Sequence, residues 1–260
     1  MTVISIANAS GSAGKTTLAV TLAALIAQSG MTCDLVDFDP QGNATHWAGI
    51  DLDPAALSIA DILEAEIGTV DLAEARQSTA IPGLRIVPVH RDRMEGIELR
   101  LSRLTGAEQL LRVALESDRD PARVTIIDCP GSLGLLTVSA LVASEKTLTV
   151  TAPGMKELGG LPLIAKTLDK VRRVYRPGLT LAGVIPSIIP SRSAGRHYTD
   201  ALEQLQGSWT DKVTPTVRRT VRVPESYAAR EPLPIYDPTH PVTDDYRQVL
   251  TWLTAQGALA

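Results

Sequence analysis

Short apolar runs alternate along the chain with longer stretches of helical spacing. The short runs are rich in β-branched residues and mostly free of charge, which predicts buried strands at Val3–Ala7, Cys33–Asp37, Leu84–Val89, Val124–Asp128, Thr147–Ala152 and Leu181–Ile185. The longer stretches predict helices over Thr16–Ser29 (closed by Gly30), Ser58–Glu66, Met94–Ser117, Leu133–Ala143, Leu158–Val174, Ala194–Gln206 and Val242–Gln256.

This alternation predicts an α/β fold, a doubly wound and mostly parallel sheet with helices on both faces. In such a sheet, ligands are expected at the carboxyl ends of the strands. The 260 residues show no repeat or long linker, so a single domain over 1–260 is expected. Two stretches rich in proline and polar residues, 186–196 and 212–241, are predicted to be surface loops.

Composition narrows the class of protein. Aromatic residues make up only 3% of the chain, so the core must consist of Leu, Ile, Val and Ala, which suits a covered parallel sheet. The net charge of −4 provides no global attraction to nucleic acid or anionic lipid. Because no apolar run approaches the roughly 20 residues of a membrane span and no signal peptide is visible, a cytoplasmic protein without membrane contact is expected.

The segment Ala9–Thr17 lies between a predicted strand and a predicted helix and has the residues of a phosphate-binding loop. Small residues let backbone N–H groups point at an anion, a lysine reaches the β- and γ-phosphates, and a hydroxyl binds Mg²⁺. The usual pattern begins with glycine where this chain has alanine, and a plain glycine-rich turn is the alternative. The predicted ATP contacts are Gly11, Ser12, Ala13, Gly14, Lys15, Thr16 and Thr17.

Two further predicted strands end in aspartate. Asp37 and Asp39 follow the second strand, and Asp128 ends the strand Val124–Asp128. Because these strand ends are expected to face the phosphates, Asp39 is predicted to hold the water shell of the metal and to orient the attacking water, while Asp37 is the structural candidate. Thr16, Asp39 and Asp128 form the predicted Mg²⁺ site.

The chain resembles the ParA/MinD family of deviant Walker ATPases, and in particular its ParA branch. The resemblance rests on the phosphate loop, on Asp-Pro-Gln-Gly-Asn at 39–43, on Asp-Cys-Pro-Gly at 128–131 and on a later stretch, 221–238. The resemblance implies a Mg-dependent ATPase that forms a face-to-face homodimer on binding ATP. It further implies binding to nonspecific DNA of the nucleoid, and a small adaptor protein, similar to McdB or ParB, that stimulates hydrolysis and carries a cargo. Pro224 and Glu225 match the region that contributes to the adenine pocket.

The chain departs from the family at the signature lysine, which normally precedes the first glycine of the loop and reaches the partner subunit's phosphates. Ser10 stands at that position. A lysine exchanged for serine resembles the McdA group, the ParA relatives that space carboxysomes. Something must offset the charge between two apposed triphosphates, and Lys156 follows a predicted strand end on the nucleotide-facing side. Lys156 is therefore the candidate trans-acting catalytic lysine, beside Lys15 and Asp39; a solvated surface lysine is the alternative.

Five arginines in two late loops could form a DNA footprint: Arg192, Arg196, Arg218, Arg219 and Arg222. A solvated basic surface is the alternative interpretation.

Other functions remain open from the sequence. A plasmid or chromosome partition ATPase would use the same chemistry with another cargo. A MinD-like membrane-cycling regulator would need a basic amphipathic C-terminal helix, whereas the end of this chain has two acids and one base. A third alternative is a metabolic P-loop enzyme or an iron-protein reductase. The reductase would need cysteine ligands at a dimer interface, and only Cys129 is a candidate.

Overall fold

The computed structural model describes residues 2–9, 13–65, 69–152, 154–190 and 196–259, without the side chains of Met155, Lys156, Arg196 and His197. The described strands form one sheet in the order β3-β4-β2-β5-β1-β6-β7. Every neighbouring pair is parallel except β3–β4 at one edge. The strands are β1 (Thr2–Ile6), β2 (Thr32–Asp37), β3 (Gln77–Ser78), β4 (Leu84–Val87), β5 (Arg123–Asp128), β6 (Lys146–Thr151) and β7 (Thr180–Pro186).

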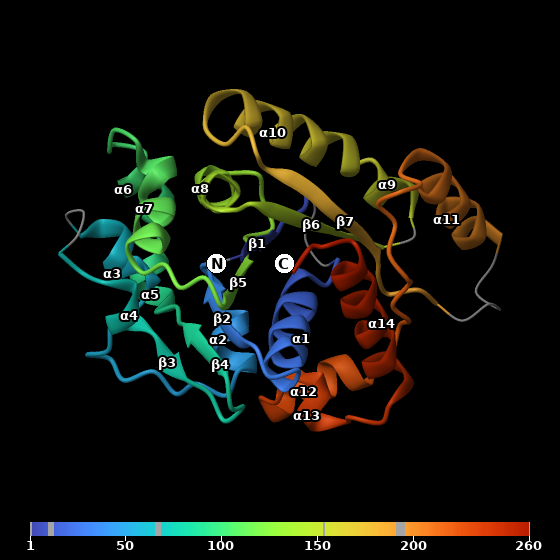
Figure 1. Ribbon diagram of the computed structural model, residues 1–260, viewed down its shortest axis with the longest axis horizontal. Helices are drawn as coiled ribbons and strands as arrows, with labels where there is room; N and C mark the ends of the chain where they lie inside the picture. The colour runs from blue at the N-terminus through green and yellow to red at the C-terminus, as the bar shows by residue number, and fades with distance from the viewer. Residues whose placement is uncertain (1, 10–12, 66–68, 153, 191–195, 260) are drawn as a thin grey trace.

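Helices connect these strands and cover both faces of the sheet (Figure 1). They are α1 (Lys15–Gln28), α2 (Asn43–Trp47), α3 (Ile59–Glu64), α4 (Leu72–Ala75), α5 (Arg91–Met94), α6 (Ile97–Leu101), the 3₁₀ helix η1 (Ala107–Gln109), α7 (Leu110–Ser117), α8 (Leu135–Ala143), α9 (Met155–Leu158), α10 (Leu161–Val174), α11 (Arg196–Ser208), α12 (Arg222–Ala229), α13 (Leu233–Tyr236) and α14 (Pro241–Ala255). No helix in the described part of the chain is long and apolar enough to span a membrane.

The core consists of two layers, one on each face of the sheet. Because successive strand residues point to opposite faces, Val3 and Val36 pack on one side while Ile4 and Leu35 pack on the other. The first layer lies under α8 and α10 and the second under α1 and α14, which Figure 1 shows on opposite sides of the strands. Both faces of the central strands are therefore buried, which explains their nearly uninterrupted apolar sequences.

The doubly wound α/β fold predicted from the sequence is confirmed. The six predicted strands correspond to β1, β2, β4, β5, β6 and β7 with ends that agree within two residues. The one strand that the sequence did not predict is β3, which pairs antiparallel with β4 at the edge of the sheet. It has only two residues and is too short to show a hydrophobic pattern.

The single helix predicted over Met94–Ser117 is wrong. The chain turns at Gly96 (φ 66°) and Gly106 (φ 76°), which interrupt the run and divide it into α6, η1 and α7. A positive φ has little steric cost for glycine but lies outside the helical region, so each glycine separates two helical segments and caps the start of the second. The stretch 212–241, predicted to be a loop, contains the short helices α12 and α13.

Candidate nucleotide site

The phosphate loop connects β1 to the amino end of α1. Gly14 precedes the first residue of α1 with φ 92°, and a Cβ there would approach the Ser187 hydroxyl to 3.4 Å. Glycine is required for this left-handed turn, which leaves the first N–H groups of α1 directed out of the helix end. Ala13 is buried, and Thr16 and Thr17 lie in the first turn of α1. The predicted contacts Gly11 and Ser12, together with Ser10, lie outside the described residues.

Lys15 is buried, with 6% of its surface exposed, and its Nζ donates a hydrogen bond of 2.8 Å to Asn8 Oδ1. Asn8 is held in turn by its Nδ2, which donates to the Val150 carbonyl oxygen at the end of β6 (3.2 Å). Burial lowers the pKa of Lys15 below its usual value, while the carboxylates of Asp128 and Asp39 oppose that shift. An ammonium group with so little water around it interacts strongly with any anion that enters the site.

Asp37 and Asp128 end the neighbouring strands β2 and β5, where they are paired in register and fully buried. Asp37 Oδ2 accepts hydrogen bonds of 2.7 Å from both the backbone N–H and the hydroxyl of Thr45. Burial is the largest cause that raises the pKa of Asp37 to about 6, against these hydrogen bonds. The pKa of Asp128 is raised well above its usual value, first by burial and then by Asp37, although the Thr16 hydroxyl and Lys15 oppose the shift.

This cluster is suited to a cation that arrives with the nucleotide. Oδ1 of Asp37 and both carboxylate oxygens of Asp128 are buried without a hydrogen-bond partner of normal geometry in the described structure. Among the described residues, no group of three or more His, Cys, Asp or Glu side chains could hold a metal by itself. Mg²⁺ typically takes one or two protein ligands and completes its shell with phosphate oxygens and water. The residues present therefore fit a Mg²⁺ ion bound together with phosphates, with Thr16 and Asp128 beside it.

Asp39 lies in a turn at the end of β2. Its Oδ1 accepts a hydrogen bond of 3.0 Å from the Gln41 N–H, and its carbonyl oxygen accepts one of 2.9 Å from the Gly42 N–H. Gly42 has φ 62° and starts α2. Unlike Asp37, Asp39 is partly exposed and lines the cavity described below, which is the arrangement expected of a residue that contacts water.

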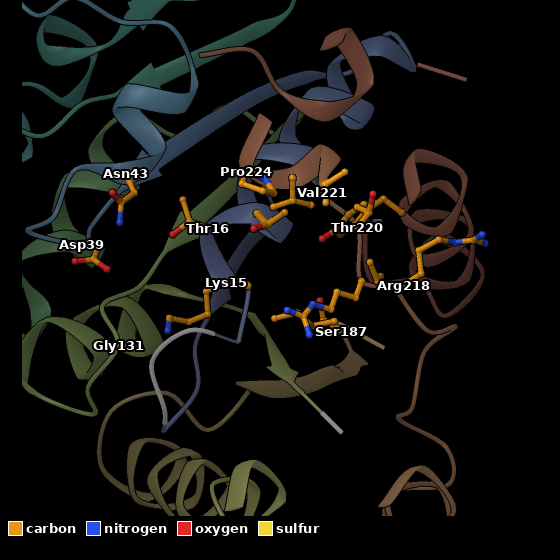
Figure 2. Close-up of a pocket in the computed structure, with 17 residues that line it drawn as sticks. Lys15, Thr16, Asp39, Asn43, Gly131, Ser187, Arg218, Thr220, Val221 and Pro224 are labelled. Carbon is orange, nitrogen blue, oxygen red and sulfur yellow. The ribbon is translucent and has the colours of Figure 1, made fainter. Parts of the chain in front are cut away.

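A cavity of about 770 Å³ joins the phosphate loop to chain far away in the sequence. Figure 2 shows Lys15 and Asp39 at one end of it and Ser187, Val221 and Pro224 at the other. Its lining residues are Gly14, Lys15, Thr16, Thr17, Asp39, Asn43, Gly131, Ser187, Ile188, Val217, Arg218, Arg219, Thr220, Val221, Val223, Pro224 and Tyr246. The volume and the division into a polar and a mostly apolar end suit a nucleoside triphosphate.

The apolar end is built by long-range pairing. The Val217 N–H donates to the Pro186 carbonyl (2.8 Å), the Ile189 N–H to the Val217 carbonyl (3.0 Å), and the Arg219 N–H to the Ile189 carbonyl (2.7 Å). These bonds hold 217–219 beside the chain that follows β7. Sequence reasoning identified Pro224 but missed Ser187, although its place at a strand end could have indicated it.

Glu225 is not among the lining residues; its carboxylate accepts a hydrogen bond of 2.8 Å from Arg222. The structure thus places Pro224 at the cavity and Glu225 beside it.

The arginines predicted to bind DNA do not form one free patch. Arg218 donates to both carboxylate oxygens of Asp245 (2.6 and 2.7 Å), and Arg222 is paired with Glu225 and Asp237. Arg219 is exposed and lines the cavity, and it forms no ion pair with any of the described residues. Arg192 and the side chain of Arg196 lie outside the described residues. The structure therefore does not test the predicted DNA-binding surface, which stays a prediction.

The backbone of Lys156 lies in α9, directly after β6, and its side chain lies outside the described structure. The turn between α9 and α10 packs near the phosphate loop, since a Cβ at Gly160 would lie 3.5 Å from the Cβ of Ala9. The structure thus brings the α9 segment next to the loop that carries Lys15.

Fold and site together define a P-loop nucleotide-binding protein. The family described as "AAA domain" matches residues 1–181. The sporulation initiation inhibitor protein Soj of Bacillus subtilis is 32% identical over 256 residues, covering 98% of this chain and 99% of Soj. The chromosome partitioning protein ParA of Caulobacter vibrioides is 33% identical over 238 residues, covering 90% of this chain and 87% of ParA. The chain therefore belongs to the ParA/Soj family of P-loop ATPases.

Solved structures agree on the fold. McdA of Cyanothece, solved without nucleotide, superposes with a TM-score of 0.87 at 20% identity, covering 97% of this chain and 99% of McdA. A structure named cobyrinic acid a,c-diamide synthase from Mycobacterium smegmatis, with an ATP analogue and magnesium bound, has a TM-score of 0.75 at 29% identity. It covers 88% of this chain and 92% of that chain.

Proposed function

We propose that this protein is a Mg-dependent ATPase whose ATP-bound form is a face-to-face homodimer that binds nonspecific DNA of the nucleoid. In this proposal a small adaptor protein of the McdB or ParB kind stimulates hydrolysis, and the cycle positions an intracellular cargo, a carboxysome, in the cytoplasm. The observation that carries the proposal is the single cavity that joins Lys15, Thr16 and Asp39 to the apolar segment around Pro224.

The geometry supports a distinct role for each of these residues. The buried Lys15 ammonium would bind the β- and γ-phosphate oxygens, and the partly exposed Asp39 would orient the attacking water beside them. Thr16 and Asp128 would hold Mg²⁺, which neutralises phosphate charge and orients the γ-phosphate when it is bound. Val223 and Pro224 offer apolar contacts to the base at the other end.

The cargo is the least constrained part of the proposal. Ser10 in place of the signature lysine and the fold likeness to McdA favour a carboxysome. Sequence identities of 32–33% with Soj and ParA over nearly the whole chain favour chromosome or plasmid partition, which is the second candidate. Purifying the protein from its host with its cargo attached, under ATP, would distinguish the two.

Replacing Lys156 by alanine is expected to abolish ATP-dependent dimerisation and to reduce turnover roughly tenfold, because two apposed triphosphates would lack a compensating charge. Light scattering after size exclusion, with and without ATP, measures the dimer, and phosphate release measures turnover. Lys166→Ala, at an exposed position on α10, is the matched control. Unchanged dimerisation and turnover in Lys156→Ala would remove this residue from the mechanism.

DNA binding is expected only with ATP and should weaken steeply as salt rises, since phosphate contacts release counterions. Cosedimentation with nonspecific DNA, in ATP, ADP or no nucleotide and over a salt series, measures both dependences. No binding under any nucleotide, in a protein that still hydrolyses ATP, would contradict the DNA step.

The membrane alternative has little support from α14, whose Asp244 and Asp245 are engaged with Arg247 and Arg218.

A further inference from the structure

Two short helices that the sequence patterns did not predict, α2 and α12, are joined by an aromatic cluster. Trp47 on α2 donates its Nε1–H to the Ser226 hydroxyl (3.2 Å) and to the Glu231 carbonyl (3.0 Å). The Tyr227 ring packs edge-on against Trp47, with centroids 5.4 Å apart, and at a tilt of 45° against His46, with centroids 4.7 Å apart. Such contacts stabilise the pair of helices beyond the burial of their surfaces.

Each helix also forms part of the nucleotide cavity. α2 begins four residues after Asp39, and its first residue, Asn43, lines the cavity on the phosphate side. α12 lines the apolar side through Val223 and Pro224 in its first turn. A second, open hollow of about 440 Å³ between the helices shares Thr16, Asn43, Val223 and Pro224 with the first and is also lined by Trp47 and Tyr227.

One hydrogen bond links the two sides directly. The Tyr227 hydroxyl donates to Asn43 Oδ1 at 3.1 Å. The other amide atom, Nδ2 of Asn43, has no hydrogen-bond partner in the described structure and faces the side on which Asp39 lies (Figure 2). An amide with its oxygen held in this way has its donor fixed toward the phosphate end of the cavity.

The other side of α2 is anchored by hydrogen bonds of Thr45. Thr45 on α2 donates twice to the buried Asp37, and its hydroxyl accepts a hydrogen bond from the Val89 N–H (3.0 Å). The short helix is therefore held between the acidic end of β2 and the aromatic cluster on α12. Asn43 on α2 and Tyr227 on α12 are therefore joined directly, by one hydrogen bond.

We propose that Tyr227 is a positioning residue for ATP hydrolysis, which fixes Asn43 and the Asp39 turn according to whether the base side of the cavity is filled. The proposal rests on the proposed ATPase function. Contact of the base with Val223 and Pro224 orders the first turn of α12. The hydrogen bond from Tyr227 then holds the Asn43 amide in one orientation. Hydrolysis thereby depends on a correctly seated nucleoside rather than on the phosphates alone.

Tyr227→Phe tests this with little structural disturbance, since the ring contacts with Trp47 and His46 remain. The turnover number is expected to fall about five- to tenfold, with the dissociation constant for a ribose-labelled ATP analogue changed less than about twofold. Asn43→Ala should give the same loss, and the double variant no further loss, because the two residues act as one unit. The matched control is Tyr175→Phe, which removes a hydroxyl bonded to Glu108 away from the cavity.

Hydrogen exchange of the segment 37–49 provides a readout that does not need hydrolysis. In the wild type, an ATP analogue with Mg²⁺ should protect this segment, and in Tyr227→Phe the protection should be lost while that of 13–20 persists. Four results would each overturn the proposal. They are unchanged turnover in Tyr227→Phe, equal losses in binding and turnover, additive losses in the double variant, and retained protection of 37–49 in Tyr227→Phe. A wild type that protects 37–49 without hydrolysing ATP would instead refute the proposed function and leave this link standing.

Discussion

Replacing Lys15 by alanine is expected to lower ATP hydrolysis at least about a hundredfold, the largest loss that any single exchange in this chain should produce. The ammonium is buried at 6% exposure, and its position is fixed by Asn8, which is itself bonded to the end of β6. Because little water competes for it, its attraction to the developing phosphate charge is much greater than that of a surface lysine. Binding should weaken as well, since ground-state phosphates meet the same charge.

Phosphate release under saturating ATP measures the turnover, and calorimetry with a non-hydrolysable analogue and Mg²⁺ measures binding. Lys170→Ala, on the exposed face of α10, removes a lysine without touching the cavity and should behave as the wild type. Lys15→Arg retains the charge on a larger, forked group that does not fit the position beside Asn8, and it should rescue little. A Lys15→Ala variant with turnover within about threefold of the wild type would show that hydrolysis occurs elsewhere.

Asp37→Asn is expected to stabilise the nucleotide-free protein at neutral pH by as much as about 3 kcal/mol, which corresponds to the rise in the pKa of Asp37 from 3.8 to about 6. The carboxylate is fully buried and faces Asp128, so its charge is unfavourable in the folded state. The asparagine oxygen can still accept both hydrogen bonds from Thr45, while the new amide group provides a donor toward the unpartnered oxygens of Asp128.

The stability difference between Asp37→Asn and the wild type should depend on pH in a defined direction. With a folded pKa above the unfolded one, the folded state binds the proton more tightly between pH 3.8 and about 6, so the contribution of Asp37 to stability is lost as pH rises through that window. The advantage of Asp37→Asn should therefore be near zero at pH 4, grow to pH 6 and stay constant above about pH 7. Urea unfolding at each pH measures the difference, with Asp211→Asn as an exposed control. A difference that does not change with pH would contradict the assignment.

The phosphate loop and the acidic strand ends could be predicted from the sequence because each is recognised from the residues that adjoin it along the chain. Gly14, Lys15 and Thr16 are consecutive, and their chemistry depends on a local turn between a strand and a helix. Asp37 and Asp128 each end an apolar run, and parallel strands bring such ends to one edge of the sheet whatever their separation in sequence. The doubly wound fold class and the resemblance to the family followed from the same local patterns, whereas the strand order came from the structure.

Local patterns failed where glycine conformation or short elements decided the structure. Nothing in the periodicity of 94–117 showed that Gly96 and Gly106 would adopt positive φ and divide the helix. Helices of four to eight residues, such as α2, α12 and α13, are stabilised by their contacts with one another rather than by their own spacing. The aromatic cluster of Trp47 and Tyr227 is one such contact.

The sequence by itself determined the fold class, the phosphate loop and the carboxylates beside it, because each depends on neighbours along the chain. Only the tertiary structure decided the base side of the cavity, the pairing of Arg218 with Asp245 and the link from Tyr227 to Asn43. The two hydrogen-bonded pairs join residues 27 and 184 positions apart along the chain. Such partners are chosen by geometry, and no local pattern of residues records them.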